Sequence, residues 1–302
     1  MKVDPAQVTV SGVSAGGYMA AQLQVAYSST FKGLGMVAGG PWNCANGSAW
    51  TATGRCMKTA GDINTNGLLQ DLKEAEARNK VDAISNLSAA RIYILNSAND
   101  TVVRPPMLQK NIDFYSQLVP ASSLKIVSDV PTEHTFPTLN YGNACDQLGS
   151  PYLSACNYDG AGEILNFVYP QKSLNRGAAD PASLHRFDQS PYADSLASLS
   201  NEGWIYVPRA CEDEGAHCAL HVALHGCSQG SDAIKDIFVT HAGYNEWAEA
   251  SGIIVLYPQT YARIFTNPEG CFDWFGYTGS DYANKAGYQM RAIKAMVDRL
   301  SK

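Results

Sequence analysis

The chain has 302 residues, 45% hydrophobic and 17% charged, which is enough apolar material for a large buried core. Its net charge is −6 and it contains no run of Lys or Arg, which argues against nucleic acid or an anionic membrane as a partner. No apolar stretch approaches the roughly 20 residues of a membrane span, and Asp4-Pro5 leaves no room for the apolar region of a signal peptide.

The first residues predict a strand, a tight turn and a helix. Val8-Thr9-Val10 is β-branched, residues 12–16 read G-V-S-A-G, and helix-compatible residues follow from 18 to 27. In a G-x-S-x-G turn the serine stands exposed above the sheet, and only small neighbours let the strand and the helix approach closely. Ser14 is therefore a candidate nucleophile, although so short a pattern also occurs by chance.

Strands and helices alternate along the next hundred residues. Apolar runs predict strands at 33–38, 90–96 and 124–127, and helices are predicted at 67–79 and 106–118. Alternation at this spacing is typical of a parallel α/β sheet.

Two polar residues complete a candidate triad with Ser14. Asp100 and His134 each come just after a predicted strand, and in α/β sheets functional residues lie at the carboxyl ends of strands. The chain order Ser, Asp, His is that of the α/β-hydrolases. The alternatives are a turn cap for Asp100 and an ordinary loop histidine for His134. The adjacent Glu133 is expected to point away and has no assigned role.

The second half of the chain supplies strands that an α/β-hydrolase normally has before its nucleophile. Here only about seven residues precede the first predicted strand. We therefore expect a circularly permuted α/β-hydrolase fold, with a mostly parallel central sheet flanked by helices. The later strands are predicted at 204–207, 219–224 and 252–257, and the helices that flank them at 232–250 and 282–300.

Eight cysteines, none in a C-x-x-C pair, argue against a zinc ribbon or a thioredoxin motif. Several lie close together in loops rich in Gly, Asn and Asp, where a disulfide can staple the loop. We expect sequential pairing: Cys44–Cys56, Cys145–Cys156, Cys211–Cys218 and Cys227–Cys271. These bonds would place the protein outside the reducing cytosol, with its signal peptide already removed. The alternative is eight reduced cysteines in a cytosolic enzyme.

Three histidines recur every four residues, at His217, His221 and His225. On a helix this spacing would suggest a metal site. The segment is predicted to be a strand, in which successive members lie roughly 13 Å apart. One zinc ion with ligands at roughly 2 Å cannot collect them, so we expect no metal, and we expect no cofactor.

Four motifs resemble the extracellular short-chain-length polyhydroxyalkanoate depolymerases, specifically their circularly permuted type II catalytic domains. The motifs are VTVSGVSAGGYMA, NDTVV, EHTFP and LHGCSQ, in this order. The resemblance covers nearly the whole chain. It implies a secreted serine esterase of α/β-hydrolase fold with an aromatic-lined crevice for one polymer chain. Many members also carry a linker and a polymer-binding domain, whereas we expect a single catalytic domain over residues 1–302.

The resemblance assigns a role to each candidate. Ser14 attacks the ester carbonyl, His134 takes its proton and later returns it, and Asp100 orients the imidazole. The backbone N–H of Ala15, at a helix N-terminus, supplies one donor of the oxyanion hole. By similarity to the family's HGC loop, the N–H of Cys227 supplies the other.

The cleft for an apolar polyester should present aromatic side chains and few charges. Trp274, in the loop after Cys271, is expected to be exposed and to bind the substrate. The alternative is that its ring belongs to the core. Trp42 and Trp50 are weaker candidates, and Tyr18 is expected to be buried.

The expected function is hydrolysis of poly(3-hydroxybutyrate) through an acyl-enzyme. The protein would act as a monomer on solid polymer or soluble oligomers, without a nucleic-acid or membrane partner. A second hypothesis is a feruloyl or acetyl-xylan esterase, because related secreted esterases share the nucleophile turn. A third, a non-catalytic binding module, would require a broken triad, and all three residues are present.

Overall fold

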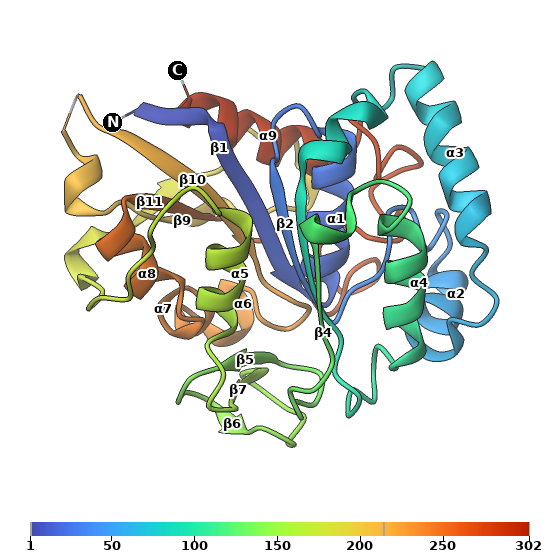
Figure 1. The fold of residues 1–302 in the computed structure, drawn as a ribbon, viewed down its shortest axis with the longest axis horizontal. Helices are drawn as coiled ribbons and strands as arrows, with labels where there is room; N and C mark the ends of the chain where they lie inside the picture. The colour runs from blue at the N-terminus through green and yellow to red at the C-terminus, as the bar shows by residue number, and fades with distance from the viewer. Residues whose placement is uncertain (1, 214, 302) are drawn as a thin grey trace.

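The computed structural model, which describes residues 2–213 and 215–301, is built around a large central sheet (Figure 1). Its eight strands lie in the order β4-β3-β2-β1-β10-β11-β9-β8. All pairs from β4 to β11 are parallel, and β9 is antiparallel to both of its neighbours. The mostly parallel sheet with helices on both faces confirms the expected fold class.

Seven of these strands occur where the sequence predicts them. The bounds of all eight strands are β1 Lys2–Val13, β2 Gly33–Val37, β3 Arg91–Leu95, β4 Leu124–Val127, β8 Leu184–Asp188, β9 Glu202–Tyr206, β10 His217–Leu224 and β11 Ile253–Tyr257. The strand without a sequence prediction is β8, at the edge of the sheet. Its side chains are exposed or half-buried, so it lacks the apolar run that marks an inner strand.

Strand β1 comes first in the chain but lies in the middle of the sheet. It pairs with β2 on one side and with β10 on the other, where Gly12 stands beside Leu224. Strands from the first half of the chain continue the sheet beyond β2, and strands from the second half continue it beyond β10. This arrangement is the one that a circular permutation predicts.

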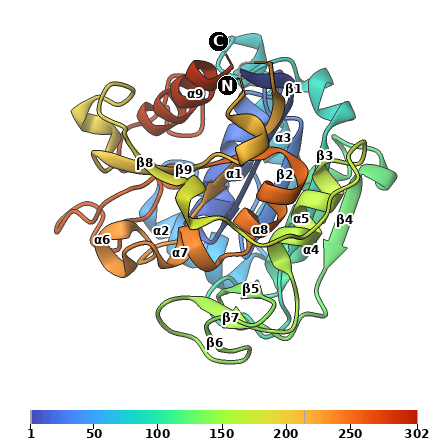
Figure 2. The ribbon, with the colours of Figure 1, turned by 90° about the vertical axis from the view of Figure 1, so that its left-hand side faces the viewer.

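Helices cover both faces of the sheet (Figures 1 and 2). Along β3, Ile92 and Ile94 contribute to the apolar core on one face, and Tyr93 and Leu95 to the core on the other, as the alternation of side chains along a strand requires. The first face carries α1 Ala15–Ala26, α3 Thr65–Ala77, α4 Pro106–Tyr115 and α9 Tyr288–Leu300, and the second carries α5 Gly160–Val168, α7 Ile237–His241 and α8 Tyr244–Ser251. Two shorter helices are α2 Ala49–Thr51, followed by a π-helical segment Ala52–Thr59, and α6 Ser231–Ile234.

The single helix expected at 232–250 is wrong. The segment forms three short helices, α6, α7 and α8. Lys235 has φ 58° and Gly243 has φ 95°, and a residue with positive φ cannot continue a right-handed helix. The amphipathic spacing of the segment continues across both positions, so the sequence pattern does not reveal the two interruptions.

A small second sheet follows His134 directly. It contains β5 Phe136–Thr138, β7 Leu153–Ala155 and β6 Asn143–Ala144, in that order across the sheet, at the bottom of Figure 1. Its strands are two or three residues long, too short for a periodic pattern to be visible in the sequence.

All eight cysteines form disulfides, and the pairing confirms the sequential prediction. The bonds are Cys44–Cys56, Cys145–Cys156, Cys211–Cys218 and Cys227–Cys271. In residues 2–213 and 215–301, no helix has the length and apolar character needed to span a membrane.

The glycines of the nucleophile turn let three backbones meet. A Cβ at Gly16 would overlap the carbonyl oxygens of Leu224 and His225. We therefore expect Gly16→Ala to push α1 away from β10 and to lower the free energy of unfolding by about 1–3 kcal/mol, measured by urea denaturation. The control is Gly54→Ala, because a Cβ there meets no atom within 4 Å. Equal stability of the two variants would contradict this account of the turn.

Candidate active site

The candidate nucleophile lies at the sharp turn between β1 and α1. Ser14 has φ 55° and ψ −124°, a conformation that costs a non-glycine residue on the order of 1–3 kcal/mol. Its N–H donates to the carbonyl oxygen of Val37 at 2.9 Å, and its own carbonyl oxygen accepts from the N–H of Tyr18 at 3.0 Å. Strand β2 and helix α1 therefore hold the strained residue in place.

Three side chains from separate loops form one chain of hydrogen bonds. Ser14 Oγ lies 2.8 Å from His134 Nε2, and His134 Nδ1 lies 2.8 Å from Asp100 Oδ2. His134 is 8% exposed and Asp100 is 3% exposed. The second carboxylate oxygen of Asp100, Oδ1, accepts the N–H groups of Val102 and Val103, each at 2.8 Å. The three residues that the sequence singles out are thus adjacent, with the carboxylate locked in position.

The partners of the imidazole determine which nitrogen carries its proton. An ionised Asp100 can only accept, so the His134 Nδ1–H donates to it and Nε2 remains free to accept the proton of the Ser14 hydroxyl. This is the geometry in which a histidine activates a serine as a nucleophile.

Two backbone N–H groups beside Ser14 are suited to an oxyanion. Ala15 begins α1, and the loop after β10 approaches so closely that a Cβ on Gly226 would lie 3.3 Å from the Cβ of Ser14. Among the described residues, the N–H groups of Ala15 and Cys227 meet no hydrogen-bond acceptor. Such free donors beside a nucleophile can stabilise the negative charge of a tetrahedral intermediate.

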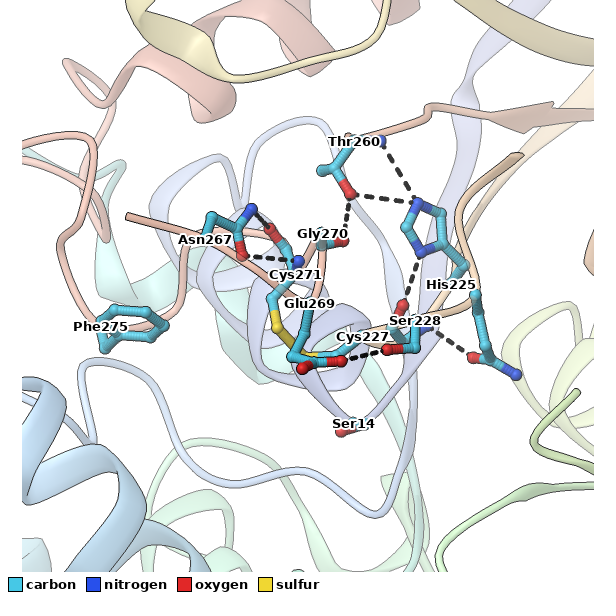
Figure 3. Close-up of a disulfide and its surroundings, with 12 residues drawn as sticks. Ser14, His225, Cys227, Ser228, Thr260, Asn267, Glu269, Gly270, Cys271 and Phe275 are labelled. Carbon is cyan, nitrogen blue, oxygen red and sulfur yellow. Dashed lines mark hydrogen bonds between the residues drawn. A yellow bond between two sulfur atoms is a disulfide. The ribbon is translucent and has the colours of Figure 1, made fainter. Parts of the chain in front are cut away.

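The Cys227 loop is tied to the segment around Glu269 (Figure 3). A disulfide joins Cys227 to Cys271. The N–H of Ser228 donates to the Glu269 carbonyl oxygen at 2.6 Å, and the Ser228 hydroxyl donates to the Glu269 carboxylate. One covalent bond and two hydrogen bonds therefore fix the loop that carries the candidate oxyanion donor.

His225 holds the same loop from the sheet side (Figure 3). Its Nδ1 lies 2.7 Å from the Gly226 carbonyl oxygen and must donate to it, so Nε2 accepts the N–H of Thr260 at 3.3 Å. Complete burial lowers the pKa of His225 to about 4. The ring therefore stays neutral near pH 7 and keeps this bonding pattern.

The three regularly spaced histidines do not gather around a common point. His221 is buried between two hydroxyl groups of β1, with Nδ1 2.7 Å from Thr9 Oγ1 and Nε2 2.7 Å from Ser11 Oγ. Burial lowers its pKa to about 3. In the part of the chain that the structure describes, no three His, Cys, Asp or Glu side chains are grouped as metal ligands.

The expected exposure of Trp274 is wrong. Its side chain is 7% exposed, and its ring stacks on Tyr18 with the centroids 4.4 Å apart. The buried carboxylate of Asp273 folds the loop inward, because it accepts N–H groups from residues 275–278. Tyr18 is buried as expected. Substrate contact by Trp274 remains a prediction.

The two weaker tryptophan candidates differ. Trp42 is 2% exposed, and its indole N–H donates to the Ala283 carbonyl oxygen at 2.8 Å. Trp50, in α2, is 89% exposed. The sequence places all of these aromatics in loops and cannot tell which rings fold inward.

Glu133 belongs to this site, although the sequence predicts that it points away. Its carboxylate turns back and accepts hydrogen bonds from Thr101 and from the N–H of His134. The one signal in the sequence is its position next to His134.

Comparisons with known proteins find close relatives, although no family model matches the chain. The chain is 42% identical over 304 residues to a poly(3-hydroxybutyrate) depolymerase of Delftia acidovorans, over all of this chain and 61% of that protein. It is 35% identical over 312 residues to a polyhydroxybutyrate depolymerase of Talaromyces funiculosus, over 99% of this chain and 90% of the relative. The chain therefore spans less than two thirds of the Delftia protein.

Solved structures resemble the fold as closely. The crystal structure of a PHB depolymerase from Penicillium funiculosum matches with a TM-score of 0.92 and 36% identity, covering 99% of this chain and 97% of that one. A serine-to-alanine variant of a PHB depolymerase complexed with an R3HB trimer matches with the same score, identity and coverage.

The Asp100–His134 hydrogen bond is testable by replacing Asp100 with Asn. The amide can donate to Nδ1, which would favour the tautomer that cannot accept the serine proton, so kcat should fall roughly 10⁴-fold. Hydrolysis of p-nitrophenyl butyrate measures this loss, with circular dichroism as the check on folding. A folded variant within tenfold of the parent kcat would show that Asp100 does not orient the imidazole.

Proposed function

The chain belongs to the poly(3-hydroxybutyrate) depolymerase family, and we propose that it is a serine esterase that hydrolyses poly(3-hydroxybutyrate) to hydroxybutyrate oligomers and monomer. The observation that carries this proposal is the hydrogen-bonded chain from Ser14 through His134 to Asp100. The R3HB trimer bound to a structural relative supports the class of substrate.

The first half of the reaction transfers an acyl group to the enzyme. Ser14 Oγ attacks an ester carbonyl carbon while His134 Nε2 takes the hydroxyl proton. The carbonyl oxygen becomes an oxyanion, which the N–H groups of Ala15 and Cys227 stabilise. The carbon–oxygen bond of the ester then breaks, and His134 gives the proton to the departing hydroxyl end of the polymer.

The second half releases the acyl group. His134 takes a proton from a water molecule, which attacks the acyl carbon, and the proton returns to Ser14 Oγ as the acyl–serine bond breaks. The carboxyl end of the shortened polymer leaves. Asp100 stabilises the imidazolium in both halves.

The proposal extends to where and how the protein works. Four disulfides are typical of an oxidising compartment outside the cytosol, which supports secretion. We expect residues 1–302 to form one catalytic domain that acts as a monomer on its polyester substrate, without a nucleic-acid or membrane partner.

Two assays run side by side test the proposal: clearing of a poly(3-hydroxybutyrate) suspension and hydrolysis of p-nitrophenyl butyrate. The parent enzyme should do both. Ser14→Ala should lose both by at least roughly 10⁴-fold, because no other hydroxyl replaces the nucleophile. Its thermal unfolding should be unchanged, because alanine keeps the Cβ and the backbone conformation of Ser14.

The matched control is Ser85→Ala, at an exposed position in a short helical turn, which should retain both activities. Clearing by the Ser14→Ala protein would refute the nucleophile. Release of ferulate or acetate from xylan, with no clearing of the polyester, would refute the substrate and favour an esterase of plant cell walls.

A further inference from the structure

We propose that Glu133 is a positioning residue for the Asp100–His134 pair. Its carboxylate forms a strap between the two loops that carry the pair. The strap is defined here as the hydrogen bonds that the Glu133 carboxylate accepts from Thr101 and from the N–H of His134. The inference rests on the proposed function, because it requires Ser14, His134 and Asp100 to act in catalysis.

The strap joins Thr101, the residue after Asp100, to the backbone of His134. Glu133 Oε1 accepts from the Thr101 hydroxyl at 2.8 Å, and Oε2 accepts from the Thr101 N–H at 3.2 Å. Oε2 also accepts from the N–H of His134 at 2.8 Å. One carboxylate therefore holds the residue after Asp100 and the histidine itself, with three donors that converge on two oxygens.

Few other bonds join these loops. Among the described residues, the remaining hydrogen bonds between residues 97–104 and 129–135 are the His134–Asp100 bond itself and a long one, 3.4 Å, from Asn99 to the Pro131 carbonyl oxygen. Without the strap, only the long Asn99–Pro131 bond and the His134–Asp100 bond would join the two loops.

The strap is itself anchored. The N–H of Glu133 donates to the Cys145 carbonyl oxygen at 2.9 Å, and Cys145 is bonded to Cys156 beside the small sheet. The backbone of Glu133 is therefore fixed from one side while its side chain reaches across to the Asp100 loop on the other.

The charge of Glu133 suits this role. Burial, the largest effect, raises its pKa, but hydrogen bonds from Thr101 and from the N–H of His134, together with the nearby imidazole, lower it overall. An ionised carboxylate only accepts, which matches the three donors. Glutamine at this position would present one amide group where an acceptor is needed.

The test compares Glu133→Ala and Glu133→Gln with the parent enzyme. In the alanine variant the imidazole should move by up to about 1 Å. We therefore expect kcat for p-nitrophenyl butyrate to fall roughly 10- to 100-fold. KM should change less than about twofold, because the strap contacts the loops behind the triad. The glutamine variant should recover part of the loss, since its amide oxygen still accepts.

A second readout does not depend on the natural substrate. A fluorophosphonate reacts with an activated serine, so its rate of labelling Ser14 should fall in parallel with kcat. The matched control is Glu249→Gln. The Glu249 carboxylate also joins two segments, through the Tyr206 hydroxyl at 2.6 Å and the Arg209 N–H at 3.4 Å, but among the described residues it is bonded to no triad member. Its labelling rate should match the parent's.

A double-mutant cycle separates positioning from general stability. In an Asp100→Asn background, Glu133→Ala should lower kcat by less than about a further threefold, because the effect of Glu133 passes through Asp100 and His134. A full additional 10- to 100-fold loss, or an unchanged kcat in the single variant, would overturn the proposal.

The labelling experiment also distinguishes failure of this inference from failure of the proposed function. If the fluorophosphonate labels Ser14 of the parent protein but the protein does not clear polyester, the proposed substrate is wrong. Slower labelling of Glu133→Ala would still support the strap. If the parent protein does not label, Ser14 is not activated and both proposals fall.

Discussion

The site depends on one constraint, the close packing of α1. This helix lies against both the end of β1 and the start of the loop after β10. At Gly12 and Gly16 the backbones lie so close that a side chain would overlap carbonyl oxygens of neighbouring segments. The chain must therefore reverse within one residue, and Ser14 takes up the strained conformation. The bonds of Ser14 to Val37 and Tyr18 offset the cost. The same contact brings the Cys227 loop beside Ser14, so it places both the candidate nucleophile and the candidate oxyanion donors.

Circular permutation leaves this geometry intact because a sheet depends on which strands pair, not on the order in which the chain visits them. Strand β10 belongs to the last third of the chain, yet it pairs with β1 along most of its length. The loop after β10 is then fixed by the Cys227–Cys271 disulfide and by His225, which burial keeps neutral. The loops of Asp100 and His134 come from neighbouring strands on the opposite side of β1, and Glu133 ties them to one another.

Much of the fold and of the candidate site could be predicted from the sequence. The features that could not be predicted were missed for physical reasons. Strand β4 occupies the expected residues 124–127. The candidate triad could be chosen because inner parallel strands are continuous apolar runs, and functional residues lie at their ends. Strand β8 escapes prediction because an edge strand is half exposed, and the break at Lys235 because side-chain periodicity does not report φ. The burial of Trp274 depends on the Asp273 carboxylate, which folds its loop through contacts that spacing along the chain cannot reveal.

The role of Ser14 as the residue that carries the acyl group can be tested by trapping the acyl-enzyme. The enzyme is mixed with p-nitrophenyl butyrate, quenched in acid during turnover, and digested for peptide mapping by mass spectrometry. We expect a butyryl group on the peptide that contains Ser14, at the hydroxyl that His134 contacts at 2.8 Å. An acyl group on another residue, or rapid turnover with no acyl-enzyme at any quench time, would contradict it.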